Sequence, residues 1–291
     1  MNRFSVVLAA AMILFFTNLL HAGEDNINEI FVGNNCTKIR TYESVVTDKP
    51  ILVVVLHGDS PFNNPDYQYQ FAKLVANRNS NVIAVGMLRP GYTDPTGRTS
   101  DGVKGDAIGD NYDEKRVNQL AHAIEKLKKM YSPSKVILAG HSGGAAITAN
   151  IVSLYPLLID HAFIVSCPCD VNAWRENMFS LTNNSIFRGN IDALSPIDLV
   201  DHLSKKITIS IFVGKNDKVA LPILSERYEK AITKKGLKVT LKIIEGSHDI
   251  FLSHDIINAI SDIIKDYNNA NAVDAKKHAA DWPRYAQKRK R

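Results

Sequence analysis

The fold is decided by a five-residue stretch, Gly140-His141-Ser142-Gly143-Gly144. A β-branched apolar run precedes it at residues 135–139, and a run of small residues follows it at residues 145–149. Between a strand and a helix, Gly-x-Ser-x-Gly places the serine on a sharp turn, and glycines flank it because only small neighbours fit there. The pattern predicts that Ser142 is a nucleophile and that the backbone N–H of Gly143 is an oxyanion donor. A plain glycine turn is the alternative, because short motifs recur by chance.

Apolar strands and amphipathic helices alternate on both sides of this stretch. Six consecutive apolar residues at 51–56 fit a strand buried on both faces, as in a parallel sheet. Similar patterns predict further strands at residues 81–87, 161–166, 207–213 and 237–244. Helices are predicted over residues 66–79, 112–130, 222–235 and 249–267, and edge strands or a hairpin within residues 29–46. This order predicts an α/β fold, a mostly parallel doubly wound sheet with helices on both faces.

The first 22 residues have the features of a secretory signal peptide. A short positive start at Asn2-Arg3 is followed by an almost wholly apolar run at residues 6–16, and Ala22 offers a small residue at the cleavage site. An uncleaved membrane anchor is the alternative, although the run is short for a bilayer span of about 20 residues. We therefore expect a secreted or periplasmic protein whose residues 23–267 form one domain.

The basic charge of the chain lies in its last residues. The formal net charge is +5, and residues 271–291 hold seven Lys or Arg and two Asp, which accounts for all of it. The body is therefore neutral, which argues against a nucleic-acid groove within the fold. We predict that the basic C-terminal tail, residues 268–291, is solvated and partly disordered. A contact between residues 288–291 and an anionic surface is the alternative.

Three cysteines, Cys36, Cys167 and Cys169, allow at most one disulfide within the chain. In an exported protein the compartment is oxidising, so a bridge is expected. The sequence is compatible with a bridge between Cys167 and Cys169, and equally with a bridge between Cys36 and one of these two. A metal site is not predicted, because no second Cys or His pair stands at ligand spacing.

Three signatures in this order resemble those of the α/β-hydrolase superfamily: His57-Gly58, the stretch 89–92 that reads Arg-Pro-Gly-Tyr, and the elbow at Ser142. The resemblance runs from about residue 45 to 266. It implies that Asp217, after the strand at 207–213, is the acid of a catalytic triad, with Asp170 as the fallback. It also implies that His248, after the strand at 237–244, is the general base.

The same resemblance implies the remaining parts of a site. The loop after the strand at 51–56 is expected to supply the second oxyanion donor, for which the backbone N–H of Asp59 is chosen. Residues 167–206 resemble a short cap-like insertion, with an ordinary irregular connection as the alternative. The loop from residue 89 to 111 is expected to border the pocket. Candidate substrate contacts are His57, Arg89, Tyr92, His141 and Trp174, although for Arg89 a role in holding its loop is favoured.

These residues indicate a serine hydrolase that cleaves a carboxylic ester through an acyl-enzyme, with neither a metal nor an organic cofactor. A serine peptidase or aminopeptidase like prolyl oligopeptidase is the alternative, so the expected partner is a small ester or a peptide. A non-catalytic binding protein on the same scaffold is disfavoured, because Ser142, Asp217 and His248 are all present.

Overall fold

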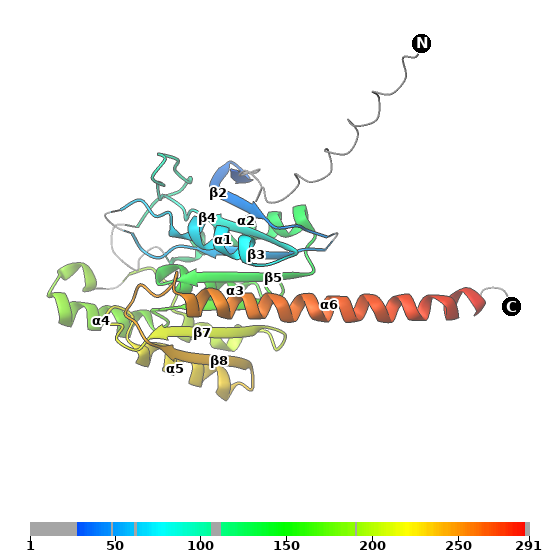
Figure 1. Cartoon of the computed structure of the whole chain (residues 1–291). Helices are drawn as coiled ribbons and strands as arrows, with labels where there is room; N and C mark the ends of the chain where they lie inside the picture. The colour runs from blue at the N-terminus through cyan, green and yellow to red at the C-terminus, as the bar shows by residue number, and fades with distance from the viewer. Residues whose placement is uncertain (1–27, 48, 61–62, 106–111, 190, 289–291) are drawn as a thin grey trace, which may run out of the picture.

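An eight-stranded sheet lies at the centre of the molecule (Figure 1). The computed structural model describes residues 28–47, 49–60, 63–105, 112–189 and 191–288. The strands, in chain order, are β1 (Glu29–Val32), β2 (Asn35–Glu43), β3 (Ile51–Leu56), β4 (Val82–Met87), β5 (Lys135–His141), β6 (His161–Val165), β7 (Thr208–Gly214) and β8 (Lys238–Ile244). Their order in the sheet is β1-β2-β4-β3-β5-β6-β7-β8.

The sheet is mostly parallel, as predicted. Only the leading hairpin departs from this, since β2 is antiparallel to both β1 and β4. Every residue of β3 and of β4 is buried, which fits strands covered by helices on both faces. The edge strand β8 alternates exposed and half-buried residues and ends the sheet on the other side.

The described residues form six α-helices. They are α1 (Tyr67–Arg78), α2 (Glu114–Tyr131), α3 (Gly143–Leu154), α4 (Val171–Thr182), α5 (Pro222–Lys234) and α6 (His254–Lys288). Five of them cover the two faces of the sheet, and α4 lies in the insertion. Residues of α1 and α6 join one hydrophobic cluster with one side of the central strands. Residues of α2, α3 and α5 join a second cluster on the opposite side. The two clusters make the molecule a three-layer α/β fold.

The strand register brings the segments after six parallel strands to one edge of the sheet. Leu56 at the end of β3 pairs with Gly140, His141 at the end of β5 pairs with Val165, and Gly214 pairs with Ile244. Because parallel strands end at the same edge, the segments that follow β3, β4, β5, β6, β7 and β8 all lie there. Figure 1 shows α4 at this end, beyond the arrowheads of β5 and β7.

The segment predicted as a cap contains regular structure. Residues 167–206 include α4 and two 3₁₀ helices, η2 (Ser185–Phe187) and η3 (Pro196–His202). Trp174 and Phe187 pack edge to face with ring centres 5.8 Å apart, and Leu224 of α5 completes the cluster. The insertion therefore has a small apolar core of its own.

The C-terminal end differs from the prediction. The last helix was expected over residues 249–267 and was to be followed by a partly disordered tail. In the structure α6 begins at His254 and runs to Lys288, and Figure 1 shows it extending past the sheet at the edge opposite α4. The physical reason is composition: residues 268–282 include five Ala, the best helix former, and neither Gly nor Pro. The predicted end of the last helix at residue 267 is therefore wrong.

One of the open disulfide pairings is formed. Cys167 and Cys169 are bridged across a Cα separation of 5.1 Å, and Cys36 is a buried free thiol. The predicted signal peptide lies outside the described residues. Within the part of the chain that is described, no helix is long and apolar enough to cross a membrane.

Candidate active site

Ser142 lies on a strained turn between β5 and α3. Its backbone adopts φ 53° and ψ −122°, a left-handed conformation that is uncommon for a residue with a side chain. The Ser142 N–H donates to the Val165 carbonyl over 2.9 Å, which anchors the turn to β6. A Cβ on Gly140 would lie 2.2 Å from the Gly144 carbonyl oxygen, so only glycine fits there. Ser142 is thereby presented at the strand edge, half-buried.

The structure brings the three predicted triad residues together. His248 Nε2 lies 2.9 Å from Ser142 Oγ, and His248 Nδ1 lies 2.9 and 3.1 Å from the two carboxylate oxygens of Asp217. The His248 side chain is 17% exposed, whereas that of Asp217 is fully buried. The hydroxyl and the imidazole are therefore open to a ligand, and the carboxylate is closed off behind them.

Asp217 is held by its own loop. Its Oδ1 accepts the backbone N–H groups of Val219 and Ala220 at 2.9 and 2.8 Å. The fallback acid, Asp170, is engaged elsewhere: it caps α4 through the Ala173 N–H, and its carboxylate lies 3.6 Å from the Arg227 guanidinium. Of these two carboxylates, the structure pairs only Asp217 with His248.

The loop formed by residues 57–60, here called the oxyanion loop, packs directly against Ser142. A Cβ on Gly58 would lie 2.8 Å from Ser142 Cβ, so glycine is required for this approach. The Gly58 carbonyl accepts from His57 Nδ1 at 2.7 Å. In a trans peptide the next N–H points the opposite way, so the Asp59 N–H faces away from His57. Among described residues, neither this N–H nor that of Gly143 has a hydrogen-bond partner.

The Asp59 carboxylate lies in a buried ion pair beneath this loop. Arg89 Nη1 donates to its Oδ1 over 2.9 Å, and Tyr112 Oη donates to its Oδ2 over 2.6 Å. The guanidinium is 1% exposed and lies over the ring of Tyr92 at 5.1 Å. His57 Nε2 also accepts the Arg89 backbone N–H. Residues of the two sequence signatures, His57-Gly58 and 89–92, therefore contact each other in one buried cluster that supports the oxyanion loop.

The five residues predicted to contact substrate all have buried side chains (His57, Arg89, Tyr92, His141 and Trp174). Trp174 packs against Phe187, and its indole N–H has no hydrogen-bond partner among the described residues. Burial, and then the charge of Arg89, hold the pKa of His57 well below its usual range, so the ring is a neutral bridge within the loop. For Arg89, the bonds to the His57 carbonyl and the Asp59 carboxylate support the favoured role of holding its loop. Contact of these five residues with substrate stays a prediction.

His141 also has only protein partners. Its Nδ1 lies 3.0 Å from Tyr67 Oη and its Nε2 lies 2.9 Å from the His248 carbonyl oxygen. Burial and the neighbouring His248 lower the pKa of His141 to about 4, so the ring is neutral near pH 7. Tyr67, Tyr112 and Ser166, which donates to the same carbonyl at 3.1 Å, were missed by sequence reasoning. No local pattern marks them.

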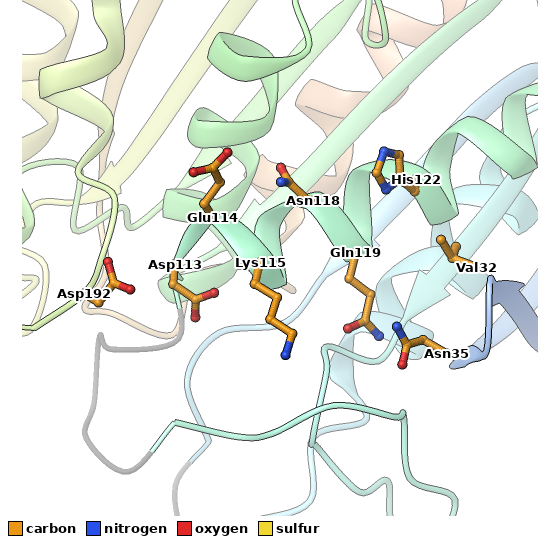
Figure 2. Close-up of a pocket in the computed structure, with 9 residues that line it drawn as sticks. All are labelled: Val32, Asn35, Asp113, Glu114, Lys115, Asn118, Gln119, His122 and Asp192. Atoms are coloured by element: carbon orange, nitrogen blue, oxygen red, sulfur yellow. The ribbon is translucent and has the colours of Figure 1, made fainter.

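A separate pocket of about 590 Å³ lies along the exposed side of α2 (Figure 2). Asp113, Glu114 and Asp192 gather at one end of it, with Lys115 beside them. Its lining includes none of the three triad residues and no nucleophile paired with a base. Across the described residues, no three His, Cys, Asp or Glu side chains come together to hold a metal ion. The pocket therefore offers no arrangement comparable with that at Ser142.

Family comparison agrees with the fold. The sequence model of the alpha/beta hydrolase family matches residues 53–212, from β3 through β7. The match covers more than half of the chain, and the protein belongs to this family. No curated protein sequence gives a significant match.

Solved structures share the fold at low sequence identity. An esterase of Pyrococcus furiosus, Pf2001, superposes with a TM-score of 0.62 at 14% identity, over 82% of this chain and 89% of that one. Est1E from Butyrivibrio proteoclasticus, solved with ferulic acid bound, superposes with a TM-score of 0.60 at 14% identity, over 84% of this chain and 99% of that one. An acylaminoacyl peptidase of Pyrococcus horikoshii superposes with a TM-score of 0.61 at 12% identity, over 82% of this chain but only 40% of the peptidase. The likeness extends to both esterases and a peptidase.

Proposed function

We propose that this protein is a serine hydrolase that cleaves carboxylic esters through an acyl-enzyme on Ser142. The observation that carries the proposal is the unbroken contact from hydroxyl to imidazole to carboxylate, 2.9 Å at each step. A hydroxyl is a weak nucleophile until a base removes its proton, and His248 Nε2 is within reach of that proton. The family membership and the strained Ser142 backbone support the same assignment.

The reaction then has two halves. Ser142 Oγ attacks the ester carbonyl carbon while its proton passes to His248 Nε2. The Asp217 carboxylate accepts from His248 Nδ1, which fixes the tautomer and stabilises the imidazolium. When the tetrahedral intermediate collapses, the alcohol leaves with the proton held by His248. Water repeats the attack on the acyl-enzyme, the same base takes its proton, and the carboxylic acid departs as the proton returns to Ser142.

The negative charge of the intermediate is assigned to two backbone donors. The N–H groups of Gly143 and Asp59 have no hydrogen-bond partner among the described residues. Gly143 is also the first residue of α3, so the positive end of the helix dipole acts on the same oxygen. Removal of one such donor typically costs about 3 kcal/mol of transition-state stabilisation.

A fluorophosphonate probe tests this function directly. Purified protein is expected to become labelled with one probe per chain, and Ser142→Ala is expected to abolish labelling while its thermal melting stays within about 2 °C of wild type. Ser153→Ala is the matched control, since Ser153 lies in α3 and donates only to the Ala149 carbonyl. If folded wild type is not labelled, or if Ser142→Ala is labelled equally, the protein is not a serine hydrolase of this kind.

The ester preference is tested with paired substrates. We expect p-nitrophenyl esters to be hydrolysed with a burst of p-nitrophenol, because acylation releases the phenol before water cleaves the acyl-enzyme. Aminoacyl-nitroanilides of matched side chain are expected to react much more slowly. A higher kcat/KM for the anilides would replace the esterase proposal with the peptidase.

We also propose that residues 1–22 direct export. The apolar run at residues 6–16 supports this, as does the disulfide between Cys167 and Cys169, because disulfides persist in oxidising compartments. The mature protein is expected outside the cytoplasm, beginning near Gly23, as measured by N-terminal sequencing of each cell fraction. A full-length chain retained in the cytoplasm would contradict export.

A further inference from the structure

We propose that Tyr67 and His141 are positioning residues that tie the oxyanion loop to the loop carrying His248, and so hold donor and base in register around Ser142. The inference rests on the proposed serine hydrolase function. The loop carrying His248, residues 245–253, is here called the base loop. The two loops come from distant parts of the chain, after β3 and after β8.

A continuous series of hydrogen bonds joins these loops. The Gly58 N–H in the oxyanion loop donates to Tyr67 Oη. Tyr67 Oη lies 3.0 Å from His141 Nδ1. His141 Nε2 lies 2.9 Å from the carbonyl oxygen of His248. The series therefore connects the peptide next to the proposed oxyanion donor with the backbone of the proposed base.

Only one arrangement of protons satisfies all three contacts. A carbonyl oxygen accepts and never donates, so His141 Nε2 carries the hydrogen. The ring is neutral, which leaves Nδ1 as an acceptor for the Tyr67 O–H. The phenolic oxygen then accepts from the Gly58 N–H. Every donor faces an acceptor, and each bond is buried or partly buried, where hydrogen bonds are strongest.

Aromatic packing holds the two rings in place. Phe251 belongs to the base loop and stacks on His141 with ring centres 5.3 Å apart. The same Phe251 meets the edge of Tyr67 at 5.9 Å and stacks on Phe71 of α1 at 4.2 Å. Tyr67 is the first residue of α1, so the helix anchors the cluster. Hydrogen bonds and ring contacts thus join the same two loops.

The His248 carbonyl has other donors, which allow the role of His141 to be isolated. Ser166 Oγ donates to it over 3.1 Å, and the Ile250 N–H, from the base loop itself, over 3.0 Å. Among the described residues, neither of these donors has a hydrogen bond to the oxyanion loop. Loss of Ser166 therefore removes one hydrogen bond to the backbone of His248. Loss of Tyr67 or His141 breaks the series of hydrogen bonds between the base loop and the oxyanion loop.

The test compares variants in ester hydrolysis and in fluorophosphonate labelling rate. Tyr67→Phe keeps the ring and removes the hydroxyl, and we expect kcat to fall about tenfold with KM within about twofold. His141→Leu removes both contacts and is expected to lower kcat about 10²-fold, because small misplacements of reacting groups have effects of this size. His141→Gln retains a donor for the carbonyl and is expected to recover most of the loss.

Matched controls separate positioning from general damage. Tyr155→Phe loses a partly buried tyrosine bond to Asn118 of α2, and His161→Leu loses a buried neutral histidine at the start of β6. Both are expected to keep wild-type kcat even where they lower stability. Ser166→Ala is expected to lower kcat less than Tyr67→Phe. The double variant Tyr67→Phe with His141→Leu should lose less than the product of the single effects.

Two outcomes overturn the inference. Wild-type kcat and labelling rate in folded Tyr67→Phe and His141→Leu would show that the two residues position nothing. So would an NMR spectrum of ¹⁵N-histidine-labelled protein in which His141 carries its proton on Nδ1. The NMR readout needs no activity. If wild type itself neither labels nor hydrolyses esters, the proposed function fails instead, so the two failures are distinguishable.

Discussion

Two buried aspartates flank Ser142, and their surroundings differ. Asp59 faces a full positive charge, the guanidinium of Arg89 at 2.9 Å, and accepts a further bond from the Tyr112 hydroxyl. Asp217 accepts two backbone N–H groups and the imidazole of His248, and the hydrogen bonds of its carboxylate include no fixed cation. One carboxylate is neutralised by a permanent partner. The other is solvated by dipoles.

The difference explains which aspartate can assist a base. A carboxylate whose charge is balanced by arginine has little left with which to stabilise an imidazolium. A carboxylate held by neutral amides presents its charge to the His248 imidazole, which gains a proton in the proposed reaction. The Asp59 pair therefore supports a loop, and the Asp217 pair is suited to the proposed catalysis.

The largest effect is expected from Asp217→Asn. The amide retains an oxygen for the Val219 and Ala220 N–H groups, so the loop is expected to stay folded. Its NH₂ group, however, faces His248 Nδ1 and favours the wrong tautomer, and kcat should fall about 10⁴-fold. Steady-state ester hydrolysis measures this, with urea unfolding as the check on stability. A loss below about tenfold would show that Asp217 is no more catalytic than Asp59.

The next effect, on stability, is expected from Arg89→Met. The substitution leaves Asp59 buried without its cation, which typically costs about 3–5 kcal/mol of the free energy of unfolding. Urea unfolding followed by tryptophan fluorescence measures the change. The double variant Arg89→Met with Asp59→Asn removes both charges and should regain part of the loss. A single-variant loss under about 1 kcal/mol would mean that the pair is not buried in solution.

The contrast also shows what sequence alone can deliver. Ser142, Asp217 and His248 each follow a strand, and a parallel sheet brings strand ends to one edge, so their meeting was predictable from strand order. The partners of the Asp59 carboxylate could not be predicted in this way. Arg89 and Tyr112 reach it from separate loops, and Tyr67 reaches His141 from the first turn of α1. Such contacts depend on side-chain directions in three dimensions, which no spacing along the chain encodes.

The next prediction concerns the free energy of unfolding in acid, to which the buried neutral rings of His57 and His141 contribute. His57 and His141 both have pKa values lowered by burial, that of His141 to about 4. Between pH 6.5 and 4 the unfolded chain binds protons at these rings and the native chain does not, so the free energy of unfolding falls as the pH falls. His141 alone contributes about 3 kcal/mol of this loss. Urea unfolding from pH 7.5 to 4.5 measures the slope.

The control for this effect is His141→Gln, which lacks the titrating ring but keeps a donor for the His248 carbonyl. Its unfolding free energy should depend less on pH than that of wild type across the same window, with the remaining slope due to groups that include His57. An unchanged slope would mean that His141 is protonated in the native protein, and the proton arrangement deduced for its contacts would then be wrong.

The smallest effect is expected at Asp170, the other position where the family resemblance allows a triad acid. Here the carboxylate caps α4 through the Ala173 N–H and lies 3.6 Å from the half-exposed Arg227. Asparagine is as good an N-cap as aspartate, and an exposed ion pair contributes at most about 1 kcal/mol. Asp170→Asn should therefore leave kcat within about twofold of wild type. A loss of kcat close to that of Asp217→Asn would show that Asp170, after β6, is the acid of the triad. Only a carboxylate that acts on His248 produces so large a change without unfolding the chain.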